Sequence, residues 1–402
     1  MNLHRTRWRF LGLLSAVVAA LAALAASLAS SASVAACAAP GGWLQASAKG
    51  SERVPGNEVL ARAAAAEIVL LGEQHDDEDH HRWQAQVLAG LHALRPNLVI
   101  GFEMFPRRVQ PALDRWIAGE LSVAALLAQT AWEENWNFPI DLYLPLFEFA
   151  RINRIPMLAL NVDARLTRAI GDKGWDAIPE REREGVGRAA PASEAYRDFL
   201  FAIYRAHAHG QGARSSSGFQ YFVEAQQNWD RAMAEALAVR RVSGSAGQPP
   251  LVVGIMGSGH LRYGFGVAHQ LRDLGVERVV TLLPLSPDED CREIRPGLAD
   301  ALFALPKKPS TPVPPPRLGV QLADADAGQG GVRVLAVTAG SLAERSGLAV
   351  GDRLLEVAGR PTASAGAVIS GVRAAPPGTW LPLRVKRGEA TFEAVIRFPP
   401  AP

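Results

Sequence analysis

Two histidines in this chain follow apolar runs that end in glycine-containing turns. Residues 68–71 are Ile-Val-Leu-Leu and lead through one glycine to Glu73 and His75. Residues 251–256 are similarly apolar and lead through a Gly-Ser-Gly turn to His260. Continuous apolar runs are typical of parallel strands buried on both faces, and ligands bind where the carboxyl ends of such strands meet. The pattern predicts a site around His75 and His260.

Polar residues also follow two other candidate strands. Glu103 comes directly after residues 98–102, and Asn161 and Asp163 end the run at 156–161. Four strand ends would therefore present imidazole, carboxylate and amide groups at one edge of a sheet. Such groups are suitable for acid–base chemistry or for holding a metal ion.

The elements that must position these groups alternate along the chain. Residues 79–94 have apolar residues at helical spacing and follow an acidic run that suits a helix N-terminus. Another apolar run covers 278–283, and residues 165–245 are polar and helical in pattern. We therefore expect an α/β domain, a mostly parallel sheet flanked by helices, with a helical insertion over the sheet.

The amino terminus has the pattern of an export signal. Three arginines before residue 10 precede an apolar stretch at 10–28 and then small residues. Residues 34–37, Val-Ala-Ala-Cys, resemble the lipobox of bacterial lipoproteins, which implies acylation of Cys37. A simple signal peptide cut near Ala36 or Ala39 is an alternative, and so is a retained membrane anchor.

Only one other cysteine, Cys291, occurs in the chain. If Cys37 carries lipid, then Cys291 has no partner and the fold contains no disulfide. If Cys37 is free, a Cys37–Cys291 bridge is permitted in an oxidising compartment.

Charge and motif content exclude several functions. The net charge is +2, but beyond residue 36 there are 39 basic and 40 acidic residues, so no general attraction to nucleic acid follows. The sequence contains no phosphate-binding Gly-x-x-x-x-Gly-Lys loop, no Gly-x-Ser-x-Gly elbow and no Cys-x-x-Cys pair. Nucleotide hydrolysis, common serine hydrolase chemistry and covalent haem attachment therefore have no support.

Five short motifs in order resemble one known family. They are Gly-Glu-Gln-His-Asp, Gly-Phe-Glu-Met-Phe, Asp-Leu-Tyr-Leu-Pro-Leu, Gln-Gln-Asn-Trp-Asp and Gly-Ser-Gly-His, at residues 72–76, 101–105, 141–146, 226–230 and 257–260. Together, over about 55–290, they resemble the ChaN haem-binding lipoproteins, which share a superfamily with TIKI/TraB proteins and erythromycin esterases. The resemblance implies haem binding in iron uptake, dimerisation in the loaded state, and an outer-membrane location.

As a haem site, the domain has several candidate ligands among which the sequence does not choose. They are His75, His260, His80, His81, Tyr143, Tyr204, Tyr221 and Tyr263. Arg107, Arg108, Arg165 or Arg262 could hold the propionates, and Phe105, Trp132, Trp136 and Phe138 could cover the macrocycle. We expect His80 and His81, at an acidic helix start, to be solvated, and Trp229 and Asp230 to be structural.

The TIKI resemblance implies a different activity, metal-dependent hydrolysis. His75, Glu103 and His260 would bind a divalent metal ion, and Glu73 would be the general base. The same four residues could also activate water without a metal, as is thought for the esterase relatives.

Residues 317–322 and 346–359 resemble a PDZ domain of the bacterial protease type, over about 317–398, which implies a small β-rich fold with two helices. In that family a Leu-Gly-Val segment, here Leu318, Gly319 and Val320, holds a peptide carboxylate while the peptide extends the sheet. The predicted segments are a signal peptide, a tether, the ChaN-like domain, a proline-rich linker and the PDZ domain, at 1–36, 37–54, 55–300, 301–316 and 317–398.

The favoured interpretation is an exported haem-binding lipoprotein on the periplasmic face of the envelope. Its PDZ domain would recruit an envelope protein or peptide by its C-terminus, and it would bind no nucleic acid. A metal-dependent hydrolase with PDZ-presented substrates is the alternative, and a pure interaction protein is the third.

Overall fold

The computed structural model describes residues 40–48, 50–136, 138–207, 212–242, 249–287, 289, 294–307, 317–324, 330–362 and 364–400. The chain divides into two compact units, Met1–Lys307 and Lys308–Pro402. The predicted signal, Cys37 and Cys291 lie outside the described residues.

The first unit contains an eight-stranded sheet in the order β2-β1-β8-β7-β3-β6-β4-β5. The six strands from β8 to β5 are parallel, and β1 and β2 are antiparallel at one edge. The strands are β1 (Trp43–Ser47), β2 (Gly50–Val54), β3 (Ile68–Glu73), β4 (Leu98–Pro106), β5 (Met157–Asn161), β6 (Leu251–Gly257), β7 (Val279–Leu285) and β8 (Ala301–Ala304). The mostly parallel α/β architecture is confirmed.

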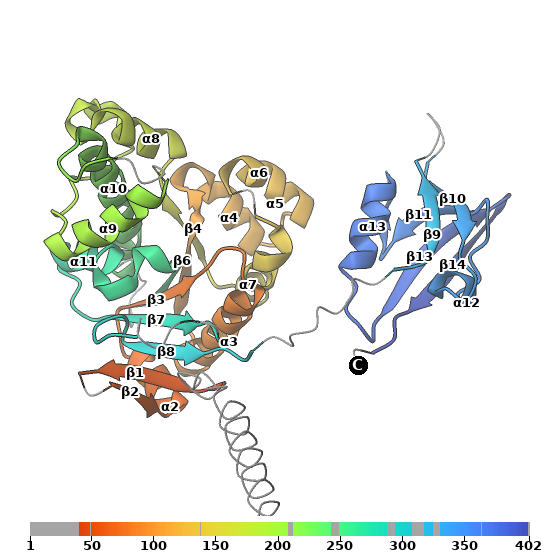
Figure 1. Cartoon of the computed structure of the whole chain (residues 1–402), viewed down its shortest axis with the longest axis horizontal. Helices are drawn as coiled ribbons and strands as arrows, with labels where there is room; N and C mark the ends of the chain where they lie inside the picture. Colours follow the sequence, from red (N-terminus) through yellow and green to blue (C-terminus); the bar gives the residue numbers. More distant parts are fainter. Residues whose placement is uncertain are drawn as a thin grey trace, which may run out of the picture. The chain divides into compact units, whose positions relative to one another are not determined.

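Helices cover both faces of this sheet (Figure 1). The helices are α2 (Gly56–Ala64), α3 (Glu78–Leu94), α4 (Gln110–Ile117), α5 (Val123–Thr130), α6 (Trp132–Asn135), α7 (Ile140–Ile152), α8 (Ala164–Lys173), α9 (Glu194–His207), α10 (Ser217–Val242) and α11 (Val267–Asp273). Successive strand residues point to opposite faces, so Val69 and Leu71 pack with α2 to α7, whereas Ile68 and Leu70 pack with α10 and α11. The sheet is therefore buried on both faces, which explains its apolar runs.

The acidic run before α3 is used as a helix start. The side chain of Asp77 accepts a hydrogen bond from the Asp79 amide at 2.9 Å and caps the helix. Helices α8, α9 and α10 lie between β5 and β6 in the chain, where the helical insertion was expected.

Two predicted boundaries are wrong. Within the expected tether at 37–54, Trp43–Ser47 and Gly50–Val54 form a hairpin, and β1 continues the sheet by pairing with β8. Within the expected linker, Ala301–Ala304 forms β8 and pairs with β7. Burial of Leu44 and Leu302 against the sheet explains why these segments belong to the first unit.

The second unit is β-rich with two helices, as expected. Its strands are β9 (Val320–Ala323), β10 (Val332–Val337), β11 (Arg353–Val357), β12 (Arg360–Pro361), β13 (Trp380–Arg387) and β14 (Ala390–Arg397), and its helices are α12 (Leu342–Arg345) and α13 (Ala365–Arg373). The antiparallel sheet has the order β14-β13-β11-β10-β9, with β12 beside β11. A separate apolar core is built from both sheet and helices.

Candidate functional site

The predicted site residues come together because their strands are neighbours. Strand β6 lies between β3 and β4, and Glu73 at the end of β3 is in register with Gly257 at the end of β6. Glu103 lies in β4, and His260 follows β6 in the short helix Ser258–His260. Both histidines and both glutamates thus lie at the carboxyl edge of the sheet.

Glu73 is the centre of the first hydrogen-bonded group. One carboxylate oxygen accepts from His75 Nδ1 at 2.8 Å and from the Tyr143 hydroxyl at 2.8 Å. The other accepts from the Gln84 amide at 3.0 Å and lies 3.3 Å from His81 Nδ1. Burial alone would raise the pKa of Glu73, but the bonds from His75 and His81 outweigh it and lower the pKa to about 2. Glu73 is therefore an ionised anchor with both oxygens occupied, and it is poorly placed to act as a general base.

The structure corrects the expectation that His80 and His81 are solvated, because both are buried. His81 Nε2 donates to the carbonyl of His75 at 3.2 Å, so both of its nitrogens carry bonds. Burial opposes the charge, but the Glu73 carboxylate raises the pKa of His81. His80 Nδ1 instead accepts from the Gln74 amide at 2.8 Å, and burial lowers the pKa of His80. His80 therefore serves the loop as a neutral acceptor.

A second group surrounds His260. Nδ1 of His260 donates to Asp230 Oδ1 at 2.7 Å, and Nε2 lies 3.4 Å from Glu103 Oε1. The Tyr196 hydroxyl donates to the other Asp230 oxygen at 2.6 Å, and the Gly257 amide donates to Glu103 at 2.6 Å. The side chains of this hydrogen-bonded group are all buried.

The carboxylates keep His260 protonated. Burial opposes the charge, but Glu103 and Asp230 together raise the pKa of His260 to about 10. Burial raises the pKa of Asp230, whereas the His260 charge overcomes burial and lowers the pKa of Glu103. His260 is therefore a fixed cation between two acids at neutral pH.

Gly257 allows the two groups to approach one another. A Cβ at this position would lie 3.0 Å from His75 Cε1 and 3.7 Å from Glu103 Oε2. A glycine here lets the imidazole approach the strand end without the tight contact that a Cβ would make, while the Glu103 carboxylate lies on the same side.

His75 differs from the other histidines of the site. Its side chain is 30% exposed, and Nε2 has no hydrogen-bond partner among the described residues. Its ring lies 4.5 Å from that of Trp136 and 5.4 Å from that of Phe138, centroid to centroid. Burial lowers and the Glu73 hydrogen bond raises the pKa of His75, with a net increase. The Nε2 atom is the one imidazole nitrogen of His75, His81 and His260 that is open to a ligand.

A hollow of about 260 Å³ adjoins these residues. It is lined by Glu103, Met104, Pro106, Asn135, Trp136, Asn161, Val162, Ala164, Thr167, Arg168 and Trp229. The Trp229 ring also contacts His260, with centroids 5.0 Å apart, and the Trp136 ring contacts His75, so two lining residues separate the hollow from the histidines, which do not line it themselves. Its walls are mainly apolar and aromatic, as is typical of small-molecule sites.

The arginines and tyrosines proposed for haem have mixed positions. Arg107 donates to the Ala232 carbonyl at 2.8 Å, and Arg108 and Arg165 both bind Asp163. Arg262 pairs with Glu289 at 2.8 Å. Tyr143 is fully buried, and Tyr204, Tyr221 and Tyr263 do not line the hollow. Of the covering aromatics, Trp136 lines the hollow, Phe138 contacts His75, and Phe105 and Trp132 are core residues.

The structure also places residues that the sequence interpretation missed. Asp230, expected to be only structural, binds His260, and Tyr196 supports Asp230 from α9. Gln84 and His81, on α3, hold Glu73. The spacing of Gln84 and His81 on one helix face is compatible with a shared target, but only the fold identifies Glu73 as that target.

The donor arrangement bears on the metal prediction. Within the described part of the chain, no three His, Cys, Asp or Glu side chains are placed to hold a metal ion. Both nitrogens of His260 already face carboxylates, so ligation by His260 would require its release from Asp230 or Glu103.

No helix in the described ranges is long and apolar enough to cross a bilayer.

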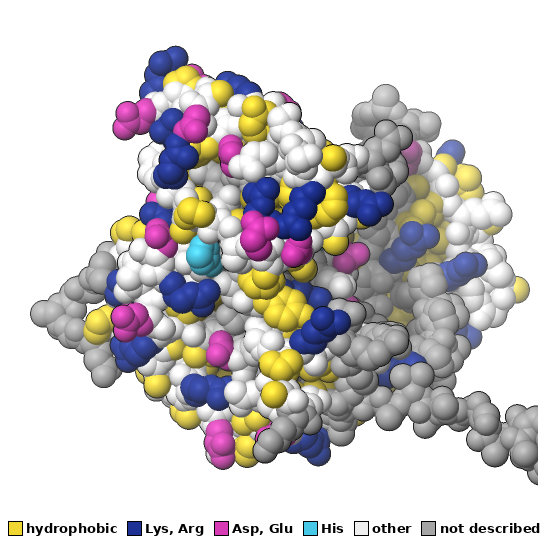
Figure 2. Space-filling view, turned by 60° about the vertical axis from the view of Figure 1, so that its left-hand side comes forward, with side chains coloured by type: hydrophobic (Ala, Val, Ile, Leu, Met, Phe, Trp, Pro, Cys, Tyr) yellow, Lys and Arg dark blue, Asp and Glu magenta, His cyan; other side chains and the backbone are white. Residues whose placement is uncertain are grey.

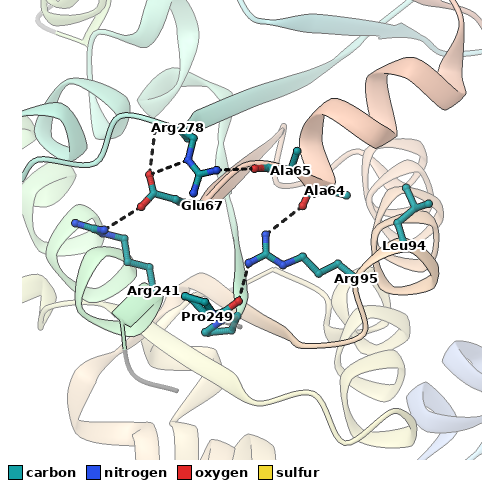
Figure 3. A pocket seen from close by; sticks show the side chains of 9 residues that line it. Ala64, Ala65, Glu67, Leu94, Arg95, Arg241, Pro249 and Arg278 are labelled. Carbon is teal, nitrogen blue, oxygen red and sulfur yellow. Dashed lines mark hydrogen bonds and ion pairs between the residues drawn. The ribbon is translucent and has the colours of Figure 1, made fainter. Parts of the chain in front are cut away.

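A larger hollow, of about 440 Å³, lies away from these histidines, at the amino edge of the sheet (Figure 3). Arg95 donates to the carbonyls of Ala64, Ala66 and Pro249, and Arg241 and Arg278 contact Glu67. These arginines bind main-chain carbonyls and a carboxylate beside the ends of helices and the starts of strands, so we regard this hollow as structural. On the face shown in Figure 2, basic and acidic side chains lie interspersed with apolar ones, in agreement with the balanced charge.

In the second unit, the predicted peptide-binding segment borders a groove. A hollow of about 360 Å³ lies between β9 and α13, and is lined by Arg317, Leu318, Gly319, Val320, Leu322, Ala365, Val368, Ile369, Val372 and Arg373. Gly319 has a φ of 81°, a conformation that glycine adopts without strain.

Comparisons with known proteins found solved structures similar to parts of this chain. A solved structure described as cofacial heme binding to ChaN of Campylobacter jejuni is 17% identical, with a TM-score of 0.50, and covers 65% of this chain and 95% of its own. The PDZ domain of HtrA3 bound to a phage-derived ligand is 24% identical, with a TM-score of 0.19 and 20% and 82% coverage. The HtrA-type protease AlgW with a decapeptide is 20% identical, with a TM-score of 0.20 and 21% and 29% coverage.

No curated protein matches the chain significantly. A PDZ-domain model matches residues 316–397. The model described as haem-binding uptake, Tiki superfamily, ChaN, matches residues 59–271, more than half of the chain. The chain therefore belongs to the ChaN haem-binding family of the Tiki superfamily and carries a PDZ domain.

Proposed function

We propose that the first unit binds haem at the carboxyl edge of its sheet, with His75 Nε2 as the axial ligand. The observation that carries this proposal is the bonding of His75. Its Nδ1 is held by the Glu73 carboxylate, whereas its Nε2 has no hydrogen-bond or ion-pair partner among the described residues. A carboxylate on the far nitrogen fixes the imidazole and increases its basicity toward iron.

The surroundings fit a porphyrin better than a small hydrated ion. Trp136 and Phe138 lie against His75, and Trp136 also lines the apolar hollow. Tyr143 is less suitable as a ligand because it is buried, it donates to Glu73, and burial raises its pKa well above the usual value. His260 is less suitable because both of its nitrogens face carboxylates. Bound haem would supply an iron centre; the chain itself orients the imidazole and supplies the apolar walls.

Haemin titration of the full chain tests this proposal. We expect a shifted Soret band with the unsubstituted protein, and its loss or displacement in His75→Ala. His92→Ala is the matched control, because His92 lies on α3 and contacts Phe149 away from the site. Absence of a Soret shift at micromolar haemin, or an unchanged spectrum in His75→Ala, would contradict the assignment.

The size of the hollow supports a homodimer in the loaded state. A volume of about 260 Å³ is below the roughly 300–1,000 Å³ typical of sites that enclose a drug-sized ligand. A haem seated here would therefore project from the surface, and a second copy could cover it. Haem binding to ChaN of Campylobacter jejuni is described as cofacial. Sedimentation with and without haemin would show the mass doubling if this is correct.

Metal-dependent hydrolysis is the second candidate, because Glu103 lies 3.4 Å from His260 Nε2 and shares the side of Gly257 with His75, although no three such side chains of the described residues are placed to hold a metal ion. It requires His260 to exchange a carboxylate contact for a metal ion. Bound manganese, zinc or cobalt that disappears in His260→Ala would support it. If the protein binds neither haemin nor a metal ion, the remaining interpretation is that it is an interaction protein.

For the PDZ unit, we propose capture of a peptide C-terminus in the groove between β9 and α13. The apolar lining residues Leu318, Val368 and Val372 suit an apolar terminal side chain, and the turn at Gly319 and Val320 would receive the carboxylate. Arg317 and Arg373 border the groove and favour acidic residues upstream in the peptide. Binding of a fluorescent peptide should be lost when its terminal carboxylate is amidated.

Export and lipid attachment remain part of the proposal. They rest on the arginines, apolar stretch and Val-Ala-Ala-Cys sequence before residue 38. The intact mass of the mature protein decides among the alternatives: acylated Cys37, a simple cleavage near Ala36 or Ala39, or an uncleaved chain. Fractionation would then show whether the protein faces the periplasm from the outer membrane.

A further inference from the structure

The hollow beside the histidines contains one charged side chain that nothing else engages. Arg168, on α8, lines this hollow and is exposed, with no hydrogen-bond or ion-pair partner among the residues described. Arg165, one turn earlier on the same helix, binds Asp163 through its guanidinium and lies outside the lining. The two arginines therefore differ in availability although they share a helix.

The two asparagines and the glutamate in the lining already have partners. Asn161 donates to the Glu103 carbonyl at 3.1 Å and accepts from the Val162 amide at 2.9 Å. Asn135 donates to the Thr130 carbonyl at 2.6 Å and accepts from Arg108 at 3.1 Å. Glu103, the one carboxylate in the lining, is held by Gly257 and His260. The hollow thus offers a free cation, and its only anion is compensated.

Further unused donors lie in the same wall. The indole N–H groups of Trp136 and Trp229 are buried and have no hydrogen-bond partner within the described ranges. A guanidinium and an indole N–H both donate, so the complementary ligand group is an acceptor with negative charge. A carboxylate satisfies both conditions.

We propose that Arg168 binds a carboxylate of the ligand in this hollow, and thereby selects porphyrins with free propionates. This inference rests on the proposed haem function and identifies the group that orients the macrocycle relative to His75. It replaces the four arginines expected from sequence, whose guanidiniums are engaged elsewhere.

Titrations of the full chain with two porphyrins test the contact. We expect Arg168→Met to weaken haemin binding by about tenfold, and Arg168→Glu to weaken it further, since a charge-assisted bond is lost and then replaced by repulsion. Arg165→Met is the matched control and should bind as the unsubstituted chain does. Haemin dimethyl ester, which lacks free carboxylates, should bind the unsubstituted chain and Arg168→Met equally.

Iron-free protoporphyrin, followed by fluorescence, separates the two proposals. Its binding should depend on Arg168 and not on His75. Unchanged haemin affinity in Arg168→Met, or an equal loss in Arg165→Met, would overturn the Arg168 inference while the haem proposal stands. Failure of the unsubstituted chain to bind either porphyrin would overturn both.

Discussion

His260 and Asp230 form a buried ion pair in which Nδ1 lies 2.7 Å from Oδ1. Tyr196 donates to the other oxygen of Asp230, so the carboxylate is held from both sides. A Cβ at Gly266 would lie 2.8 Å from Asp230 Oδ1 and 2.5 Å from the His260 carbonyl, so the close approach also depends on that glycine. The pair fixes His260 against the end of β6 and supplies the positive charge that compensates Glu103.

Asp230→Asn should destabilise the fold by on the order of 2 kcal/mol, because a buried cation loses its closest anion. Urea unfolding at pH 7 measures the change. Asp273→Asn is the control, since it removes the same charge from a half-exposed pair with Arg231 and should cost less than about 1 kcal/mol. Equal costs for the two substitutions would show that the Asp230–His260 pair contributes nothing special.

Stability should decline on both sides of a plateau that spans mildly acidic to neutral pH. His260 has a pKa raised from 6.5 to about 10, so its contribution is complete below 6.5 and disappears as pH rises toward 10. Glu73 has a pKa lowered from 4.5 to about 2, so its contribution is complete above 4.5 and disappears as pH falls toward 2.

Thermal unfolding across pH 2 to 10 tests this profile. His260→Gln should lower stability near neutral pH and flatten the alkaline decline, because the group that titrates there is gone. The acidic decline should remain, since Glu73 is untouched. An alkaline decline of the same size in His260→Gln would assign it to other groups.

The parallel strands and the convergence of Glu73, His75, Glu103 and His260 could be predicted because both follow from local patterns. A continuous apolar run predicts a strand buried on both faces, and the residue after it must lie at the carboxyl edge. The hairpin of β1 and β2 could not be found this way. The β2 sequence Gly-Ser-Glu-Arg-Val is exposed for four of its five residues and has no apolar period, because it lies at the sheet edge.

The sequence singled out Tyr143 as a candidate ligand and Asp230 as part of a motif, but not the hydrogen bonds that they make from their helices. Asp230 and Tyr143 reach the site from α10 and α7, far from His260 and Glu73 in sequence, and only tertiary packing brings them together. The same limit applies to Arg107 and Arg168. The sequence does not distinguish these two arginines. In the fold, Arg107 donates to a main-chain carbonyl, whereas Arg168 lines the hollow.

Gly257→Ala should disturb His75 without unfolding the domain. The added methyl carbon would lie 3.0 Å from His75 Cε1 and 3.2 Å from Nε2, so the imidazole must shift by a few tenths of an ångström. We expect haemin affinity to fall by about tenfold or more, which corresponds to about 1.4 kcal/mol, with a displaced Soret band. Gly259→Ala is the control, because a Cβ there meets nothing within 4 Å. Equal affinity in both variants would argue against ligation by His75.

Haemin affinity should decrease as pH falls. The pKa of His75 is raised because the Glu73 hydrogen bond and nearby carboxylates outweigh the opposing effect of burial, so the imidazolium persists to higher pH than usual. Iron binds the neutral imidazole, and protons therefore compete, by about tenfold per pH unit below that pKa. Titrations at several pH values, compared with His75→Ala, should show a slope that the variant lacks. A pH-independent affinity would point to a ligand other than His75.

Ile369→Lys should weaken peptide capture by the second unit while leaving its fold intact. Ile369 lies on α13, lines the groove and is 44% exposed, so a lysine can enter solvent but places charge where an apolar terminal side chain would pack. Val350→Lys is the matched control, because Val350 is 67% exposed and does not line the groove. Fluorescence anisotropy with a peptide ending in an apolar residue should show a loss of about tenfold in Ile369→Lys only. Equal binding by both variants would move the peptide site away from α13, and a lower unfolding temperature in Ile369→Lys alone would instead assign Ile369 to the core.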